Sequence, residues 1–175
     1  MKKIGLILIL TVIPCVLFAF SASDIYFSTQ AGATGAINTT LGAVVAEADA
    51  NAKISFGGFL GYRNALYGDF SFTYKVFEKQ FSRFTNVPEY TQMCLGFGWL
   101  YKSDVFLLSL DGGLTIAKVG TNWEAGAYAE ATPKFILSSF DEVGRMALGF
   151  PVQFVYTGNT YRYGIGVVIS WEIYQ

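Results

Sequence analysis

The last strand-like segment of this chain constrains its fold more than any other feature. From residue 161 to residue 173, every second residue is apolar, and the residues between them are small, polar or charged except for Val168. Side chains on a β-strand alternate between two faces, so the segment predicts a strand with one wholly apolar face. Soluble half-buried strands alternate over about four to eight residues, whereas membrane strands need about 9–11. The unbroken run over residues 161–173 therefore favours a transmembrane strand.

The start of the chain is typical of a bacterial secretory signal. Lys2 and Lys3 precede an almost purely apolar stretch at residues 4–20, and small residues follow it. This order of a basic, an apolar and a small-residue region predicts a cleaved signal peptide at residues 1–23. Two alternatives are a retained helical anchor and lipoprotein processing at Cys15.

Composition supports a membrane barrel formed by residues 24–175 as one domain. Charged residues make up 14% of the chain, against about 25% in ordinary soluble domains. Apolar residues reach 53%, yet no run after the signal approaches the length of a spanning helix.

Removing Lys2 and Lys3 from the 12 basic residues leaves 10 against 13 acidic ones. The absence of any basic run makes nucleic acid an unsuitable partner.

Alternating segments occur throughout the predicted domain. In each of them apolar side chains occupy one face, and Gly, Ser, Thr or charged side chains occupy most of the other. Long connections are expected at residues 34–51 and 78–89, and shorter ones elsewhere. The eight predicted strands cover residues 24–33, 52–62, 66–77, 90–101, 105–118, 123–137, 145–156 and 161–173.

The signal peptide, the eight segments and the aromatic-bearing final strand resemble the small eight-stranded outer-membrane proteins. This group includes the OmpX/Ail, OmpA-transmembrane-domain, opacity and OmpW-like families. The resemblance implies an all-β fold, an eight-stranded antiparallel up-and-down transmembrane β-barrel in the bacterial outer membrane. It also implies outer-membrane lipid and the barrel-assembly machinery as partners.

The sequence offers little for catalysis or cofactor binding. Histidine is absent from the whole chain, and Cys94 is the one cysteine after the predicted signal. Outer-membrane hydrolases and acyltransferases resemble one another in using a histidine, whose pKa lies near neutrality. Most zinc sites need several thiolate or imidazole ligands. We therefore expect neither an enzyme nor a cofactor or metal site.

The charged side chains on the lumen face of the strands are the main candidate site residues. The turn near Gly120 places Asp111 opposite Glu130, and two carboxylates so close need a nearby cation or a shared proton. The favoured interpretation is a structural ion network that fills the lumen, since an eight-stranded barrel is just wide enough for its own side chains. An ion or proton path is the alternative. The predicted network comprises Lys53, Asp69, Lys75, Asp111, Glu124, Glu130, Arg162 and Glu172.

Two prolines fall inside predicted neighbouring strands. Pro133 and Pro151 cannot donate ladder hydrogen bonds, and proline within sheets is confined to edges, strand starts and bulges. They predict an irregularity in the barrel wall: a pair of bulges near the periplasmic end, a broken sixth strand, or a local opening between the sixth and seventh strands.

These observations favour a structural or surface-interaction role, with an extracellular partner contacting the loops at residues 34–51 and 78–89. One alternative is a narrow channel or an OmpW-like transporter of small or apolar solutes. Another is a soluble periplasmic lipocalin-like binder, in which the apolar face of each strand points inward.

Overall fold

The structure is a computed structural model in which every described segment is built on β-strands. It describes residues 25–40, 43–80, 90–119, 121–140, 144–158 and 160–174, so the predicted signal peptide at residues 1–23 lies outside the described residues. The strands are β1 (Ile25–Thr40), β2 (Ala43–Phe59), β3 (Asn64–Gln80), β4 (Tyr90–Lys102), β5 (Phe106–Val119), β6 (Asn122–Phe140), β7 (Gly144–Gly149), β8 (Val152–Thr157) and β9 (Thr160–Tyr174).

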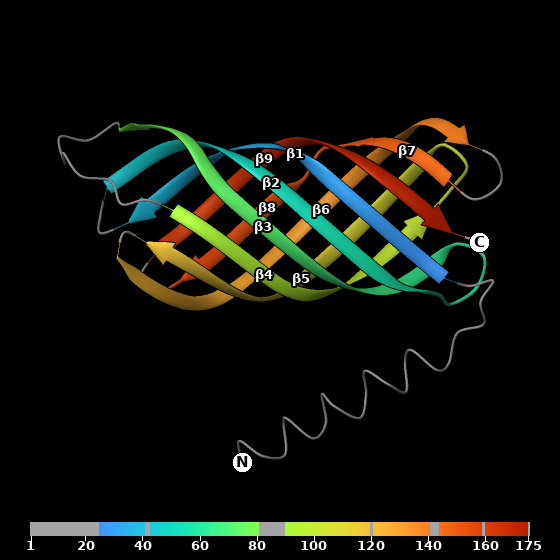
Figure 1. The fold of residues 1–175 in the computed structure, drawn as a ribbon, viewed down its shortest axis with the longest axis horizontal. Helices are drawn as coiled ribbons and strands as arrows, with labels where there is room; N and C mark the ends of the chain where they lie inside the picture. The colour runs from blue at the N-terminus through green and yellow to red at the C-terminus, as the bar shows by residue number, and fades with distance from the viewer. Residues whose placement is uncertain are drawn as a thin grey trace, which may run out of the picture.

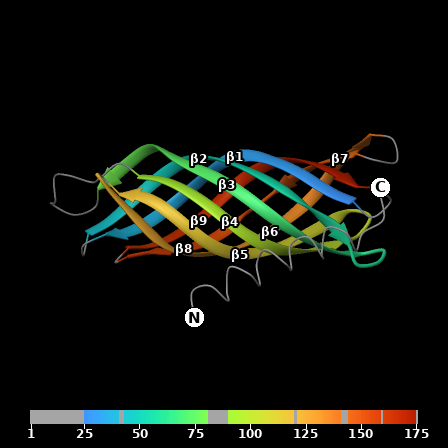
Figure 2. The same ribbon diagram turned by 60° about the horizontal axis from the view of Figure 1, so that its bottom comes forward.

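The strands close into an antiparallel barrel. Each strand from β1 to β6 pairs with the next one along the chain, and β9 pairs back to β1. The short strands β7 and β8 lie end to end between β6 and β9, so together they take the place of one strand. The wall therefore has eight strand positions, which confirms the predicted up-and-down barrel. Figures 1 and 2 show the tilted strands surrounding a single long axis.

The two ends of the barrel differ in what they carry. The start of β1, the end of β9 and the ends of β2, β4 and β6 lie at one end of the barrel, the terminus end (Figure 1). The ends of β1, β3, β5 and β8 lie at the opposite end, the loop end. Each half of the molecule takes the name of its end.

No helix in the described part of the chain is long and apolar enough to cross a membrane.

Side-chain direction follows the predicted alternation. On β9, Ile165 is 68% exposed and Ile169 is 57% exposed, whereas Arg162 on the same strand is 1% exposed. On β5, Leu114 is 71% exposed and the neighbouring Thr115 is 1% exposed. Apolar side chains thus cover the outside of the barrel, and polar and charged side chains face the lumen.

The predicted long connection at residues 34–51 is wrong. β1 continues to Thr40 and β2 begins at Ala43, and the two strands pair over their whole length. The alternation is weak here because, apart from Ile37, most outward positions of the segment carry alanine, glycine or threonine. Its inward positions do alternate, and they place Glu47 and Asp49 in the lumen. At the other predicted loop, β3 extends to Gln80, and residues 81–89 lie outside the described residues.

The seventh predicted strand is interrupted where Pro151 occurs. β7 ends at Gly149 and β8 begins at Val152, whereas β6 runs without a break through Pro133. Two backbone hydrogen bonds cross the interruption: Phe150 donates to the carbonyl of Pro133 (2.9 Å), and Gly166 donates to the carbonyl of Pro151 (2.9 Å). The two prolines therefore lie at the same seam of the wall, and strand pairing resumes on both sides of it.

Candidate functional site: the lumen network and the outer face

A cluster of four ionisable side chains occupies the centre of the lumen. The ammonium group of Lys53 on β2 forms an ion pair with Asp111 on β5 and lies 3.1 Å from Glu130 Oε1 on β6. Asp69 on β3 places Oδ2 3.8 Å from the same nitrogen. Among the described residues, Lys53 is the one cation within salt-bridge distance of these three carboxylates. This arrangement, the central cluster, joins four strands across the barrel.

Two tyrosines complete the central cluster by donating hydrogen bonds to its carboxylates. The hydroxyl of Tyr67 donates to Asp111 Oδ2 (2.9 Å), and that of Tyr128 donates to Asp69 Oδ2 (2.6 Å). Both rings need space that β4 provides through glycine: a Cβ at Gly98 would lie 2.2 Å from Tyr67 Cζ, and one at Gly96 would lie 2.2 Å from the Tyr128 hydroxyl. Any side chain at these positions would displace the tyrosines.

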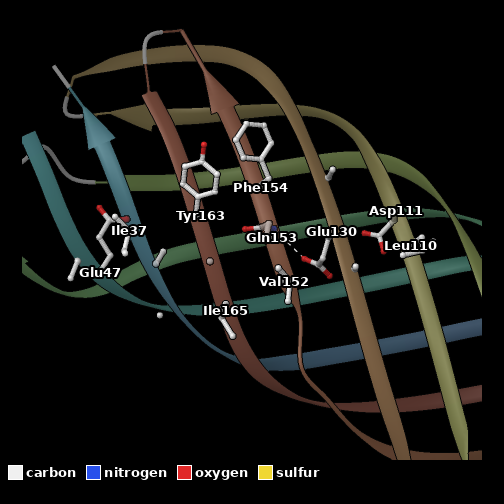
Figure 3. Close-up of a pocket in the computed structure, with 16 residues that line it drawn as sticks. Ile37, Glu47, Leu110, Asp111, Glu130, Val152, Gln153, Phe154, Tyr163 and Ile165 are labelled. Atoms are coloured by element: carbon white, nitrogen blue, oxygen red, sulfur yellow. Dashed lines mark hydrogen bonds between the residues drawn. The ribbon is translucent and has the colours of Figure 1, made fainter. Parts of the chain in front are cut away.

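A second group of polar side chains surrounds Arg162 in the loop-end half. Its guanidinium forms an ion pair with Asp49, donates to Glu47 Oε2 (3.2 Å) and donates to Gln153 Oε1 (3.1 Å). The amide nitrogen of Gln153 in turn donates to Glu130 Oε2 (3.1 Å). Gln153 therefore connects the Arg162 group to the central cluster, and Figure 3 shows it beside Glu130.

The terminus-end half is closed by one ion pair and a packed apolar cluster. Lys134 Nζ donates to Glu172 Oε1 (2.6 Å), and the Tyr26 hydroxyl donates to Glu172 Oε2 (2.7 Å). The ring of Tyr26 packs against those of Phe59 and Tyr67 at centroid distances of 6.1 and 5.5 Å. The apolar cluster comprises Tyr26, Phe59, Ala65, Tyr67, Leu100, Leu107 and Ala147, all buried.

The structure distributes the predicted network residues over several groups. Lys53, Asp69, Asp111 and Glu130 meet in the central cluster, Arg162 belongs to the loop-end group, and Glu172 to the terminus-end pair. Lys75 on β3, opposite Asp49, and Glu124 on β6 are half-buried closer to the loop end.

Three ionic residues of the lumen lie outside the predicted network. Glu47 and Asp49 belong to the segment wrongly predicted as a loop, although acidic residues alternate there with alanines. Lys134 lies four residues after Glu130 on the same strand, so the alternation of β6 is the signal that places it in the lumen. The mutual distances of these groups depend on the stagger of the strands, which the sequence pattern does not contain.

No group of three or more His, Cys, Asp or Glu side chains within the described ranges is arranged to hold a metal ion. The three carboxylates of the central cluster instead surround the ammonium group of Lys53.

Comparison with solved structures assigns the fold. The attachment invasion locus protein Ail of Yersinia pestis superposes with a TM-score of 0.60 at 10% identity, over 85% of this chain and 99% of that one. A structure of Ail with the heparin analogue sucrose octasulfate gives a TM-score of 0.61 at 9% identity, with the same coverage. Neisserial surface protein A superposes with a TM-score of 0.52 at 11% identity, over 82% of this chain and 95% of that one.

No protein-family model matches the sequence, and a search of curated proteins finds no match. The shared feature is therefore the architecture and not a sequence motif. In its fold, this chain is a small barrel with eight strand positions, similar to the structures of Ail and NspA.

Proposed function

We propose that this protein is an integral outer-membrane barrel with a structural or surface-interaction role. The observation that carries the proposal is the reversed polarity of the barrel: Leu95, Leu114 and Ile165 are each more than 60% exposed, while Lys53 and Arg162 are buried. An exterior of this kind is stable in lipid and unstable in water. The predicted soluble lipocalin-like alternative needs the opposite orientation, with the apolar face inside, and is wrong.

The outer membrane is the membrane that suits this fold. Closed barrels satisfy every backbone hydrogen bond of a spanning sheet, and bacterial outer-membrane barrels combine an apolar outer band with a polar interior, as this chain does. The predicted signal peptide at residues 1–23 agrees with export, and folding of the exported chain would require the barrel-assembly machinery.

A filled lumen favours this role over that of a channel. Leu100 and Leu107 are fully buried at the terminus end, and the central cluster spans the middle of the barrel. A solute would have to displace both. The proposal includes no catalysis, because the chain has no histidine and the acids of the central cluster and Glu47 are held in ion pairs.

A partner outside the cell would contact the loop end. One structure of Ail contains a heparin analogue, so a barrel of this architecture is able to bind a ligand. Residues 34–51, predicted as a loop that contacts the partner, belong mostly to the paired strands β1 and β2. The connection after β3 is therefore the remaining predicted contact. Its residues 81–89 lie outside the described part of the chain.

Cell fractionation followed by electrophoresis of unheated and heated samples tests the proposal. We expect the protein in the outer-membrane fraction, with a band that migrates faster before boiling because the barrel stays folded in detergent. Recovery in the soluble periplasm, without any shift on heating, would overturn it. Reconstitution into a planar bilayer then separates the two membrane roles, and steady conductance would favour the channel.

A further inference from the structure

A hollow of about 820 Å³ extends along the barrel wall over β5, β6, β8, β9, β1 and β2. Its outward-facing lining side chains fall into two adjacent rows that follow the strand register. The row nearer the terminus end contains Leu110, Ala131, Val152, Ile165 and Gly35, and the row nearer the loop end contains Ala129, Phe154, Tyr163, Ile37 and Ala46. The space between these rows is called the outer groove below.

Large side chains border the middle of the outer groove, and small residues flank them on both sides, with Ala129 and Ala131 on β6 and Gly35 on β1. Phe154 and Tyr163 form one border, with ring centroids 5.1 Å apart, and Val152 and Ile165 form the other, as Figure 3 shows. A Cβ built at Gly35 would meet only the carbonyl oxygen of Ile165, at 3.8 Å. The groove is therefore long, apolar and unfilled near this glycine.

The lumen residues that alternate with these rows bring no free charge to the groove. Asp111 and Glu130 are engaged with Lys53, and Glu47 is engaged with Arg162, all on the inner side of the wall. A ligand on the outer side would thus meet hydrocarbon and aromatic surface.

We propose that the outer groove binds one acyl chain of a membrane phospholipid, held in place more firmly than the lipids around the rest of the barrel. The groove is continuous with the apolar exterior that the proposed function places in lipid, so phospholipid chains have direct access to it. A flexible linear chain can follow a narrow path across several strands, whereas a second barrel would present a convex wall to it. The inference rests on the proposed membrane location.

Photocross-linking tests the inference on the full chain. The barrel is reconstituted into phosphatidylethanolamine–phosphatidylglycerol vesicles with a trace of phosphatidylcholine that carries a diazirine in the middle of its acyl chain. We expect cross-links at Ala129, Ala131 and Gly35 to be at least fivefold more frequent than at Phe70 and Leu95, which are outward residues on β3 and β4.

Filling the groove provides the matched variant. Gly35→Leu places a side chain in open space within the groove. Lipid cross-linking to the groove residues Ala129 and Ala131 should therefore fall at least threefold. Gly68→Leu is the control, because its Cβ also meets nothing closer than 3.8 Å and it lies on β3, outside the groove. The heat shift on electrophoresis verifies that both variants are folded. Ala131→Leu serves as a second filling variant.

The outcomes separate the two proposals. Cross-links spread evenly around an inserted barrel would overturn the groove and leave the membrane location intact. A failure to insert into vesicles would overturn the membrane location as well. Cross-linking that is normal at Phe70 and Leu95 but absent at the groove residues would show that the groove is shielded from lipid, as by a second copy of the barrel, which also contradicts the inference.

Discussion

The lumen and the outer face of this barrel reverse the polarity of a soluble protein. Inside, Lys53 and Arg162 are buried within ion pairs that join strands distant in sequence. Outside, leucine, isoleucine and aromatic side chains are exposed along every strand position. The same backbone separates the two environments, so each strand contributes alternately to both. The lumen therefore holds particular strands together through directional ion pairs and hydrogen bonds, whereas the outer face makes the barrel stable in lipid through nonspecific apolar contact.

Removal of the lumen cation should have the largest effect. Lys53→Met leaves three carboxylates of the central cluster without their ammonium group, and a buried ion pair that loses one partner costs about 3–5 kcal/mol. The free energy of unfolding, measured by denaturant titration in vesicles, should fall by that amount. The double variant Lys53→Met with Asp111→Asn should recover part of it. A single variant as stable as the wild type would contradict the central cluster as described.

An arginine on the outer face should cost somewhat less and should depend on depth. Leu114 lies within β5 and is 71% exposed, and an arginine on the lipid face near the midplane costs about 2–4 kcal/mol. Leu66→Arg near the terminus end of β3 is the control, with about 0–1 kcal/mol expected near an interface. Both values come from the same denaturant titration. Equal, negligible costs at the two positions would indicate an exterior in contact with water.

A methyl group at Gly98 should weaken the lumen without any change of charge. Its Cβ would lie 2.2 Å from Tyr67 Cζ, and such overpacking costs about 1–3 kcal/mol. Gly68→Ala on the neighbouring strand adds the same methyl group 3.8 Å from its nearest contact and should be close to neutral. Thermal unfolding monitored by the electrophoretic shift compares the two. Equal transition temperatures would show that Tyr67 does not need this space.

Alternation predicted much of the fold because lipid and lumen impose opposite demands on successive residues. It identified the inward positions of Lys53, Asp69 and Arg162 and the outward face of β9. It failed for residues 34–51, where alanine and glycine outside gave little contrast in hydrophobicity to the inward residues.

The contacts between distant strands lie beyond the sequence pattern. The register of β5 with β6 placed Asp111 opposite Glu130 because one short turn joins the two strands. Lys53 reaches them from β2, across the barrel, and that contact depends on the tilt and stagger of all the intervening strands. The outer groove has the same origin, since its two rows exist only after six strands are in register.

The smallest expected effect concerns the seam at Pro133 and Pro151, where the question is whether the wall stays closed between the lumen and the exterior. Proline removes a donor at each position, yet the amides of Phe150 and Gly166 donate across the seam. We expect their hydrogen exchange to be slowed to within about tenfold of that of Phe154 on β8, a difference of about 1.4 kcal/mol at most. Exchange measured on the reconstituted barrel by NMR provides the comparison. Much faster exchange confined to these two amides would indicate a wall that opens locally there, and would connect the polar lumen with the lipid-facing side.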